Sequence, residues 1–264
     1  MYNTPLKTTN TIRGLTVLKT HYLTQVKLLK EKVESFDQYP YSLPALKQFD
    51  SLELHPQVTF IVGENGSGKS TLLEAIATAW GFNPEGGTIN FNFSTRESHS
   101  DLWKCLRLSK NFKKPRDGFF LRAESFYNVA SSIDAMDEEP ANARRVIESY
   151  GGVSLHKQSH GESFFSLMVH RFGGRGLYIL DEPEAALSPD RQLAMLSRIH
   201  QLVSDESQFI IATHSPIIMA YPNAQILGIS DDGINPINYE ETDHYQTTKM
   251  FINGYEKLVE SICQ

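Results

Sequence analysis

Three uninterrupted apolar runs, beginning at Val58, Gly176 and Gln208, stand out from the mixed hydrophobic and polar pattern of the chain. Each run is short and is followed by a polar or glycine-containing segment, which is typical of a buried strand that ends in a loop. Between the second and third runs, Arg191–Leu202 has the length and pattern of a helix. The sequence therefore predicts a strand-helix-strand unit in an α/β fold with a mixed sheet.

Further elements follow from the same patterns. Leu72–Ala77 predicts a helix that ends near Gly81, and Ser163–Phe172 predicts another helix. Ser51–Leu54 and Gly118–Arg122 predict strands. These elements extend the α/β pattern over most of the chain.

The N-terminal part and the middle of the chain are less regular. Leu15 and Val17 alternate with polar residues and favour β structure over Ile12–Lys19, whereas Gln25–Glu34 mixes lysines with apolar residues. Residues 88–158 are more polar, and we interpret them as a lobe inserted into one domain that covers residues 1–264.

Composition narrows the class of protein. With 264 residues, 40% of them hydrophobic, the chain can bury a substantial core. Cys105 and Cys263 form no CxxC or His-rich pattern, and no apolar run approaches the roughly 18 residues of a membrane helix. We therefore expect a reduced, cytoplasmic protein with no transmembrane segment of its own. The net charge of -6 restricts nucleic-acid binding to a local basic patch.

The loop after the first apolar run predicts a phosphate-binding P-loop, the Walker A motif. Its glycines permit a tight turn that aims backbone N–H groups at phosphate oxygens, and the following helix presents its positive dipole end. Lys69 is expected to reach the β and γ phosphates of a nucleoside triphosphate, and Ser70 to hold Mg²⁺. The residues expected to bind the nucleotide are Glu64, Asn65, Gly66, Ser67, Gly68, Lys69, Ser70 and Thr71.

The second apolar run ends in Asp181 and Glu182, which is a Walker B pattern. At the carboxyl end of a buried strand, Asp181 is placed to hold the Mg²⁺ ion. Glu182, one residue further, is placed to orient or deprotonate the attacking water. Glu184 lies further around the turn, and we expect it to be a solvated or helix-capping residue.

The third apolar run delivers His214 to the same end of the predicted sheet. A histidine in this position can sense the γ phosphate, and we assign it to the catalytic group together with Glu182. A single histidine after a strand is otherwise most often structural, so the assignment depends on the neighbouring motifs.

These motifs, in this order, resemble the ABC-type ATPases, which have a switch histidine at the place of His214. The resemblance predicts a signature loop shortly before Walker B, where the chain has residues 158–162. Ser159, Gly161 and Glu162 agree with the family's LSGGQ motif, whereas the residues at 158 and 160 depart from it. In this family the signature loop binds the ATP held by a second subunit. The resemblance therefore implies an ATP-dependent homodimer, with Ser159 and Gly161 as further nucleotide contacts.

Other family elements map onto the chain with departures. The D-loop position holds Ser188 in place of the usual aspartate, and Glu124 stands at the Q-loop position, where the family has glutamine and where it would serve as a further metal ligand. Glu124 is equally well explained as a carboxylate at a strand end. Tyr39 or Tyr41 could stack on adenine, and the sequence does not choose between them.

The resemblance covers Ser51 to Ile229, and the motifs are similar to those of a subgroup of compact predicted AAA-type ATPases, like SMC and DNA-repair heads. In SMC proteins a long coiled coil separates the P-loop from the signature. The interval from Thr78 to Gln158 has no sustained heptads, so we expect a head without an arm.

Two remaining patterns have simple alternative explanations. Five basic residues around Phe112, which we call the basic run, could contact nucleic-acid phosphates or form a solvated loop. The basic run consists of Arg107, Lys110, Lys113, Lys114 and Arg116. His156, His160 and His170 have no recognised metal spacing, so a zinc site is not expected.

The sequence thus predicts an ATP-hydrolysing, ABC-type switch that dimerises with itself and acts on DNA or through an unidentified protein partner. One alternative is a nucleotide-binding subunit of an ABC membrane transporter. Another is a non-hydrolytic, nucleotide-gated scaffold.

Overall fold

The computed structural model describes residues 22–89, 100–138 and 145–263. The expected β segment Ile12–Lys19 lies outside these residues. The strands in these residues form a three-stranded sheet and a six-stranded sheet. The strands are β1 Leu23–Leu28, β2 Ser51–Glu53, β3 Val58–Gly63, β4 Leu106–Lys110, β5 Asp117–Arg122, β6 Gly176–Asp181, β7 Gln208–Ala212, β8 Gln225–Ser230 and β9 Gly233–Pro236.

The six-stranded sheet has the order β5-β6-β7-β3-β8-β9. Its first four pairings are parallel, and only β8 and β9 pair antiparallel. The three apolar runs found in the sequence are its neighbouring strands β6, β7 and β3. The prediction of an α/β fold with a mixed sheet is therefore confirmed.

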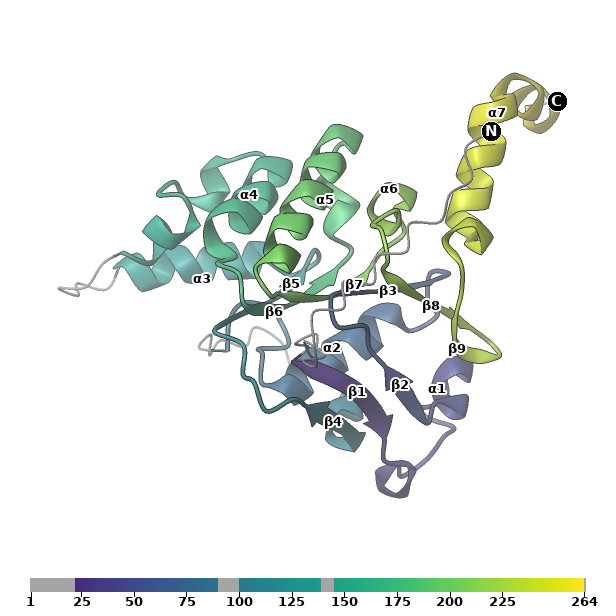
Figure 1. Cartoon of the computed structure of the whole chain (residues 1–264), viewed down its shortest axis with the longest axis horizontal. Coiled ribbons are helices and arrows are strands. Elements are labelled where there is room, and N and C mark those ends of the chain that lie inside the picture. The colour runs from purple at the N-terminus through teal and green to yellow at the C-terminus, as the bar shows by residue number, and fades with distance from the viewer. Residues whose placement is uncertain (1–21, 90–99, 139–144, 264) are drawn as a thin grey trace, which may run out of the picture.

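Both faces of the large sheet are covered, which explains why its strands are apolar without interruption. Phe60 of β3 and Tyr178 of β6 pack into one core with the helices α3 to α6, whereas Ile61 and Ile179 point to the opposite core with α2. Figure 1 shows this arrangement, with α3 to α6 on one face of the sheet and α2 and the small sheet on the other. Each fully buried side chain of this size contributes roughly 1.5–3 kcal/mol.

The helices follow the sequence pattern closely. The predicted helix after the P-loop is α2, with a left-handed C-cap at Gly81, and the predicted Arg191–Leu202 helix lies within α5. The helix predicted at Ser163–Phe172 begins earlier and continues as a π-helical turn, Leu167–Arg171. The α-helices are α1 Pro44–Gln48, α2 Lys69–Trp80, α3 Phe126–Glu138, α4 His160–Ser166, α5 Pro189–Ser204, α6 Pro216–Met219 and α7 Asp243–Ile262.

Residues 88–158 contribute to both sheets. They supply β4, which pairs with β1 at the edge of the small sheet, and β5, which pairs with β6 at the edge of the large sheet. The division of the chain into one domain with an inserted lobe stays a prediction.

The last helix, α7, differs from the others because none of its residues is buried. It rises away from the body of the molecule, and its backbone is non-helical at Gly254 (Figure 1). None of the helices in the described part of the chain, α7 included, is both long enough and apolar enough to span a bilayer.

A partly buried ion pair joins the amino end of β5 to the segment that precedes β6. Asp117 accepts hydrogen bonds from the Arg171 guanidinium at 2.8 Å, the Gly173 backbone N–H at 3.0 Å and the Tyr178 hydroxyl at 2.8 Å. Burial opposes ionisation of Asp117, but these hydrogen bonds and the Arg171 charge outweigh it, so its pKa lies below the ordinary value. The network ties the segment after α4 to the edge of the large sheet.

We predict that Asp117→Asn lowers the free energy of unfolding by about 2 kcal/mol at neutral pH, because it removes the carboxylate that pairs with Arg171 and accepts its hydrogen bond. Because the folded-state pKa is depressed, the stabilisation is present above the unfolded-state pKa of about 4 and is lost as the pH falls through the folded-state pKa. Urea unfolding at pH 7 and in acid measures both effects. The exposed pair Lys104–Asp101 provides the control, and Asp101→Asn should cost less than about 1 kcal/mol. Equal losses for the two variants at pH 7 would contradict the prediction.

Candidate nucleotide-binding site

The P-loop leaves β3 at Gly63 and enters α2 at Lys69. Gly66 and Gly68 have φ of 81° and 99°, a left-handed backbone that strains any residue with a Cβ. Gly68 is the N-cap of α2, so the loop turns directly into the positive end of this helix. The local geometry is that of an anion-binding loop.

Lys69 lies over its own loop. Its ammonium donates hydrogen bonds to the backbone carbonyls of Gly63 at 3.0 Å and Glu64 at 2.9 Å. Burial lowers the pKa of Lys69, while the nearby carboxylates Glu182 and Asp181 raise it. A buried ammonium held only by carbonyl oxygens is well suited to exchange them for phosphate oxygens.

The residues of the loop fit a phosphate group. Among the described residues, Ser67 is one of the few whose buried side-chain oxygen has no hydrogen-bond partner. A buried hydroxyl without a partner costs about 1–3 kcal/mol, which a phosphate oxygen at this position would recover. The loop thus combines a free hydroxyl, a buried ammonium and backbone N–H groups at a helix N-terminus.

Ser70 and Asp181 meet at the same edge of the sheet. The Ser70 hydroxyl donates to Asp181 Oδ1 at 3.0 Å, although the two residues lie far apart in the chain. Burial raises the pKa of Asp181 to about 7, because its charged form has left water. A hydroxyl and a buried carboxylate side by side are oxygen ligands of the kind that Mg²⁺ takes.

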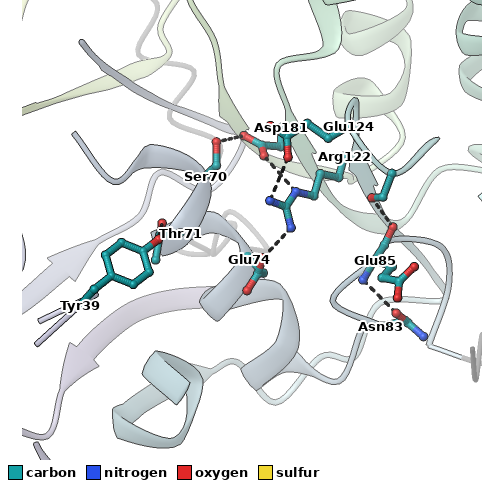
Figure 2. A network of polar contacts seen from close by, with 10 residues as sticks. Tyr39, Ser70, Thr71, Glu74, Asn83, Glu85, Arg122, Glu124 and Asp181 are labelled. Carbon is teal, nitrogen blue, oxygen red and sulfur yellow. Dashed lines mark hydrogen bonds and ion pairs between the residues drawn. The ribbon is translucent and has the colours of Figure 1, made fainter. Parts of the chain in front are cut away.

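Arg122 also belongs to the cluster of Ser70 and Asp181, although the sequence pattern gave it no role. Arg122, at the end of β5, contacts Glu74 of α2 at 2.5 Å and Glu124 at 3.1 Å, and it lies 3.9 Å from Asp181 (Figure 2). Glu124 itself is 82% exposed and forms an ion pair with Arg122. The pairing of β5 with β6 sets Arg122 opposite Asp181. The sequence predicts a strand that ends at residue 122, but it does not show which strand pairs with it.

His214 is held from three sides. Its Nε2 lies 3.4 Å from Glu182 Oε1, its Nδ1 lies 2.8 Å from Nε2 of His244, and its backbone N–H donates to Glu184. Glu182 has a left-handed backbone with φ of 51°, which turns the chain sharply at the end of β6. The structure therefore brings Glu182 and His214 together at the end of the strands that carry the P-loop and Asp181.

The expectation that Glu184 is solvated or caps a helix is wrong. Its side chain accepts a hydrogen bond from the backbone of His214, and burial raises its pKa. The difference arises because the short 3-10 turn Pro183–Ala186 folds back toward the end of β7 instead of leading the chain outward. His244 gave no local sequence signal, because it lies at the start of α7, far along the chain from the motifs.

A cavity of about 540 Å³ lies between the P-loop and the first turns of α7. It is lined on one side by Glu64 and Asn65 of the P-loop and on the other by Asp243 and Thr247 of α7, with His214 and His244 between them. The edge of the nucleotide site is thus open beside the histidine pair.

The signature residues lie apart from the P-loop within one chain. Ser159 caps α4, and both its backbone N–H and its hydroxyl donate to Glu162, at 3.0 and 2.6 Å. A Cβ on Gly161 would lie 2.6 Å from the backbone carbonyl of Ala186, in the segment after Walker B. The chain packs its signature position against its own D-loop position, on the face of the sheet opposite to α2 (Figure 1).

The two tyrosines considered for adenine stacking differ in position. Tyr39 is exposed, and its hydroxyl lies 2.7 Å from the Thr71 hydroxyl in the first turn of α2 (Figure 2). Tyr41 is turned inward, and its hydroxyl donates to the thiol of Cys105 at 3.2 Å. Tyr39 therefore lies beside the P-loop helix with its ring accessible.

In residues 22–89, 100–138 and 145–263, no group of three or more His, Cys, Asp and Glu residues could hold a metal ion.

Comparison with known proteins agrees with this geometry. The AAA domain family matches residues 32–152. The cell division ATP-binding protein FtsE of Bacillus subtilis is 26% identical over 219 residues, which cover 76% of this chain and 92% of that protein. The L-cystine transport system ATP-binding protein TcyN of Escherichia coli is 29% identical over 181 residues, which cover 62% of this chain and 72% of that protein.

The solved SMC head domain from Thermotoga maritima is similar at 17% identity, over 82% of this chain and 99% of that one, with a TM-score of 0.42. The parallel strands deliver a P-loop, a Walker B carboxylate and a histidine to one edge of the sheet, which is the arrangement of the P-loop NTPase fold. In sequence the chain is similar to the AAA domain family and to ABC-type ATP-binding proteins.

Proposed function

We propose that the protein binds Mg-ATP at the edge formed by β3, β6 and β7 and hydrolyses it. The observation that carries this proposal is the contact between Ser70 and Asp181 beside the buried ammonium of Lys69. In this proposal Lys69 and the P-loop N–H groups hold the β and γ phosphates, and Ser70 and Asp181 hold the Mg²⁺ ion. Tyr39 is the residue we propose to lie against adenine, because its ring is exposed beside α2.

The reaction we propose is an in-line attack of water on the γ phosphorus. Glu182 orients the water and accepts its proton, since it is the half-exposed carboxylate next to the buried Asp181. His214 donates a hydrogen bond toward the γ phosphate. Glu124 remains a proposed water-linked metal contact, and its exposure and its ion pair with Arg122 fit an outer position better than a direct one.

The cycle we propose includes a second copy of the chain, because Ser159 and Gly161 do not reach the P-loop of their own subunit. In a head-to-tail homodimer they would contact the ATP of the partner. The hydroxyl of Ser159 would then exchange Glu162 for a phosphate oxygen.

For the client of the cycle we propose DNA, contacted by the basic run. Arg107, Lys110 and Lys114 are exposed there, whereas Lys113 pairs with Glu206 at 2.9 Å. A membrane-transporter partner is the second candidate, and the observation that favours it is the name of the cystine-transport relative. A cytoplasmic location stays an expectation under both.

The first prediction of this proposal concerns catalysis. Glu182→Gln should lower the turnover of ATP by about 100-fold or more while ATP still binds, because the substitution removes the proton acceptor and retains the shape of the side chain. Phosphate release and fluorescent-nucleotide binding measure the two quantities. Lys69→Ala should abolish binding itself. A wild-type protein that binds ATP without turnover would instead support the scaffold alternative.

The second prediction concerns dimerisation. Glu182→Gln should form a dimer in saturating Mg-ATP, and adding Ser159→Arg should prevent the dimer without preventing ATP binding, because the larger side chain fills the closing interface. Light scattering after size exclusion measures the mass. Ser204→Arg, at the exposed end of α5, is the matched control and should leave the dimer intact. An unaffected dimer in the Ser159→Arg variant would remove the signature assignment.

The third prediction concerns the client. Glu182→Gln with Mg-ATP should bind duplex DNA with an affinity that falls steeply as salt rises. Reversing Arg107 and Lys114 to Glu should weaken binding and reduce the salt slope by about one for each phosphate that the protein no longer neutralises. The same reversal at Lys249 and Lys257 of α7 is the control. A closed dimer that binds no DNA would favour the transporter-type partner.

A further inference from the structure

His244 makes a contact with the catalytic histidine that the proposed reaction does not use. Nε2 of His244 lies 2.8 Å from Nδ1 of His214, and the two rings are 4.9 Å apart between centroids at an angle of 62°. At this distance one nitrogen donates a proton and the other accepts it.

The surroundings of His214 decide which nitrogen carries the proton. Nε2 of His214 has no hydrogen-bond partner among the described residues, but it lies 3.4 Å from the carboxylate of Glu182, which is only an acceptor. The proton of a neutral His214 is therefore favoured on Nε2, which leaves Nδ1 as an acceptor. His244 then has to donate its Nε2–H to His214 Nδ1.

The electrostatic surroundings favour the neutral form of both histidine rings, His214 and His244. Burial and the charge of Lys69 lower the pKa of both histidines, and a charge on His244 would lower the pKa of His214 further. Among the charged groups around the pair, Glu182 favours protonation of His214 and Asp243 favours protonation of His244, but burial and Lys69 dominate.

The backbone of His214 is fixed independently of its ring. Glu184 accepts the backbone N–H, and the preceding residues belong to the buried strand β7. The ring can still rotate about its own side-chain bonds, so its orientation depends on the group that Nδ1 meets. That group comes from the first turn of α7, whose N-cap residue Thr242 is buried.

We propose that His244 is a positioning residue that holds His214 in the Nε2–H form, with this N–H directed at the γ-phosphate side of the site. The proposal rests on the function proposed above. It makes the first turn of α7 part of the catalytic arrangement, so that a movement of α7 changes the protonated nitrogen and the direction of His214.

The kinetic test compares His244→Phe with the wild-type protein. Phenylalanine keeps the ring shape and loses the donor, so turnover should fall about 10- to 100-fold, which is the range found when the orienting partner of a metal-bound histidine is removed. The KM for ATP should change less than twofold. His170→Phe, at an exposed histidine, is the matched control and should retain full turnover. His244→Gln keeps an N–H donor and should recover part of the loss. Full turnover in His244→Phe would overturn the proposal.

The second test is nitrogen-15 NMR of the histidine rings in the nucleotide-free protein. Nδ1 of His214 should give the signal of an unprotonated nitrogen in the wild-type protein and shift toward a tautomer mixture in His244→Phe. A protonated Nδ1 in the wild-type protein would overturn the proposal. The measurement on the wild-type protein needs neither turnover nor the folding of a variant. An unprotonated Nδ1 in a wild-type protein without ATPase activity would therefore refute the proposed function alone.

Discussion

The meeting of three parallel strand ends is the constraint on which the nucleotide site depends. β3 and β6 do not pair with each other, because β7 lies between them and pairs with both. Every residue of β6 is buried, and the strand is apolar up to its last residue, the buried Asp181. Polar side chains at or just after the carboxyl end of each strand are thus presented at one edge. Lys69 and Ser70 follow from β3, and His214 follows from β7.

The chemistry at the carboxyl ends of these strands follows from several carboxylates that lie together in a largely buried site. Raising the pKa of Asp181 from 3.8 to about 7 corresponds to roughly 4 kcal/mol of destabilisation of its charged form. Lys69 and Arg122 offset only part of the charge of Glu74, Asp181 and the glutamates that follow it. A divalent cation with a polyphosphate would complete the balance, because the cation neutralises the carboxylates while the phosphates take the ammonium.

Much of the fold was predictable because the burial pattern is local. Patterns of consecutive residues predicted the strands that begin at Val58, Gly176 and Gln208, and they also predicted helix α5. The structure has these elements at those positions. The contacts of Arg122, Glu184 and His244 were not predictable, because each depends on how distant segments meet. Arg122 reaches Asp181 only through the pairing of β5 with β6, and His244 reaches His214 only because α7 starts beside β7. The role of Ser159 depends on a second molecule, which no pattern within one chain describes.

The position of β7 also determines when a nucleotide site can first exist during synthesis on the ribosome. A nascent chain that has emerged as far as β6 already contains both Walker motifs, yet it has no strand to hold them side by side. β3 must wait for β7 and then β8, its two neighbours in the sheet, and until then its apolar side chains lack their final cover. Such distant pairing slows folding and lengthens exposure to aggregation. A nucleotide bound at this edge would therefore not assist the early steps of folding, and would stabilise the chain only after β8 has been made.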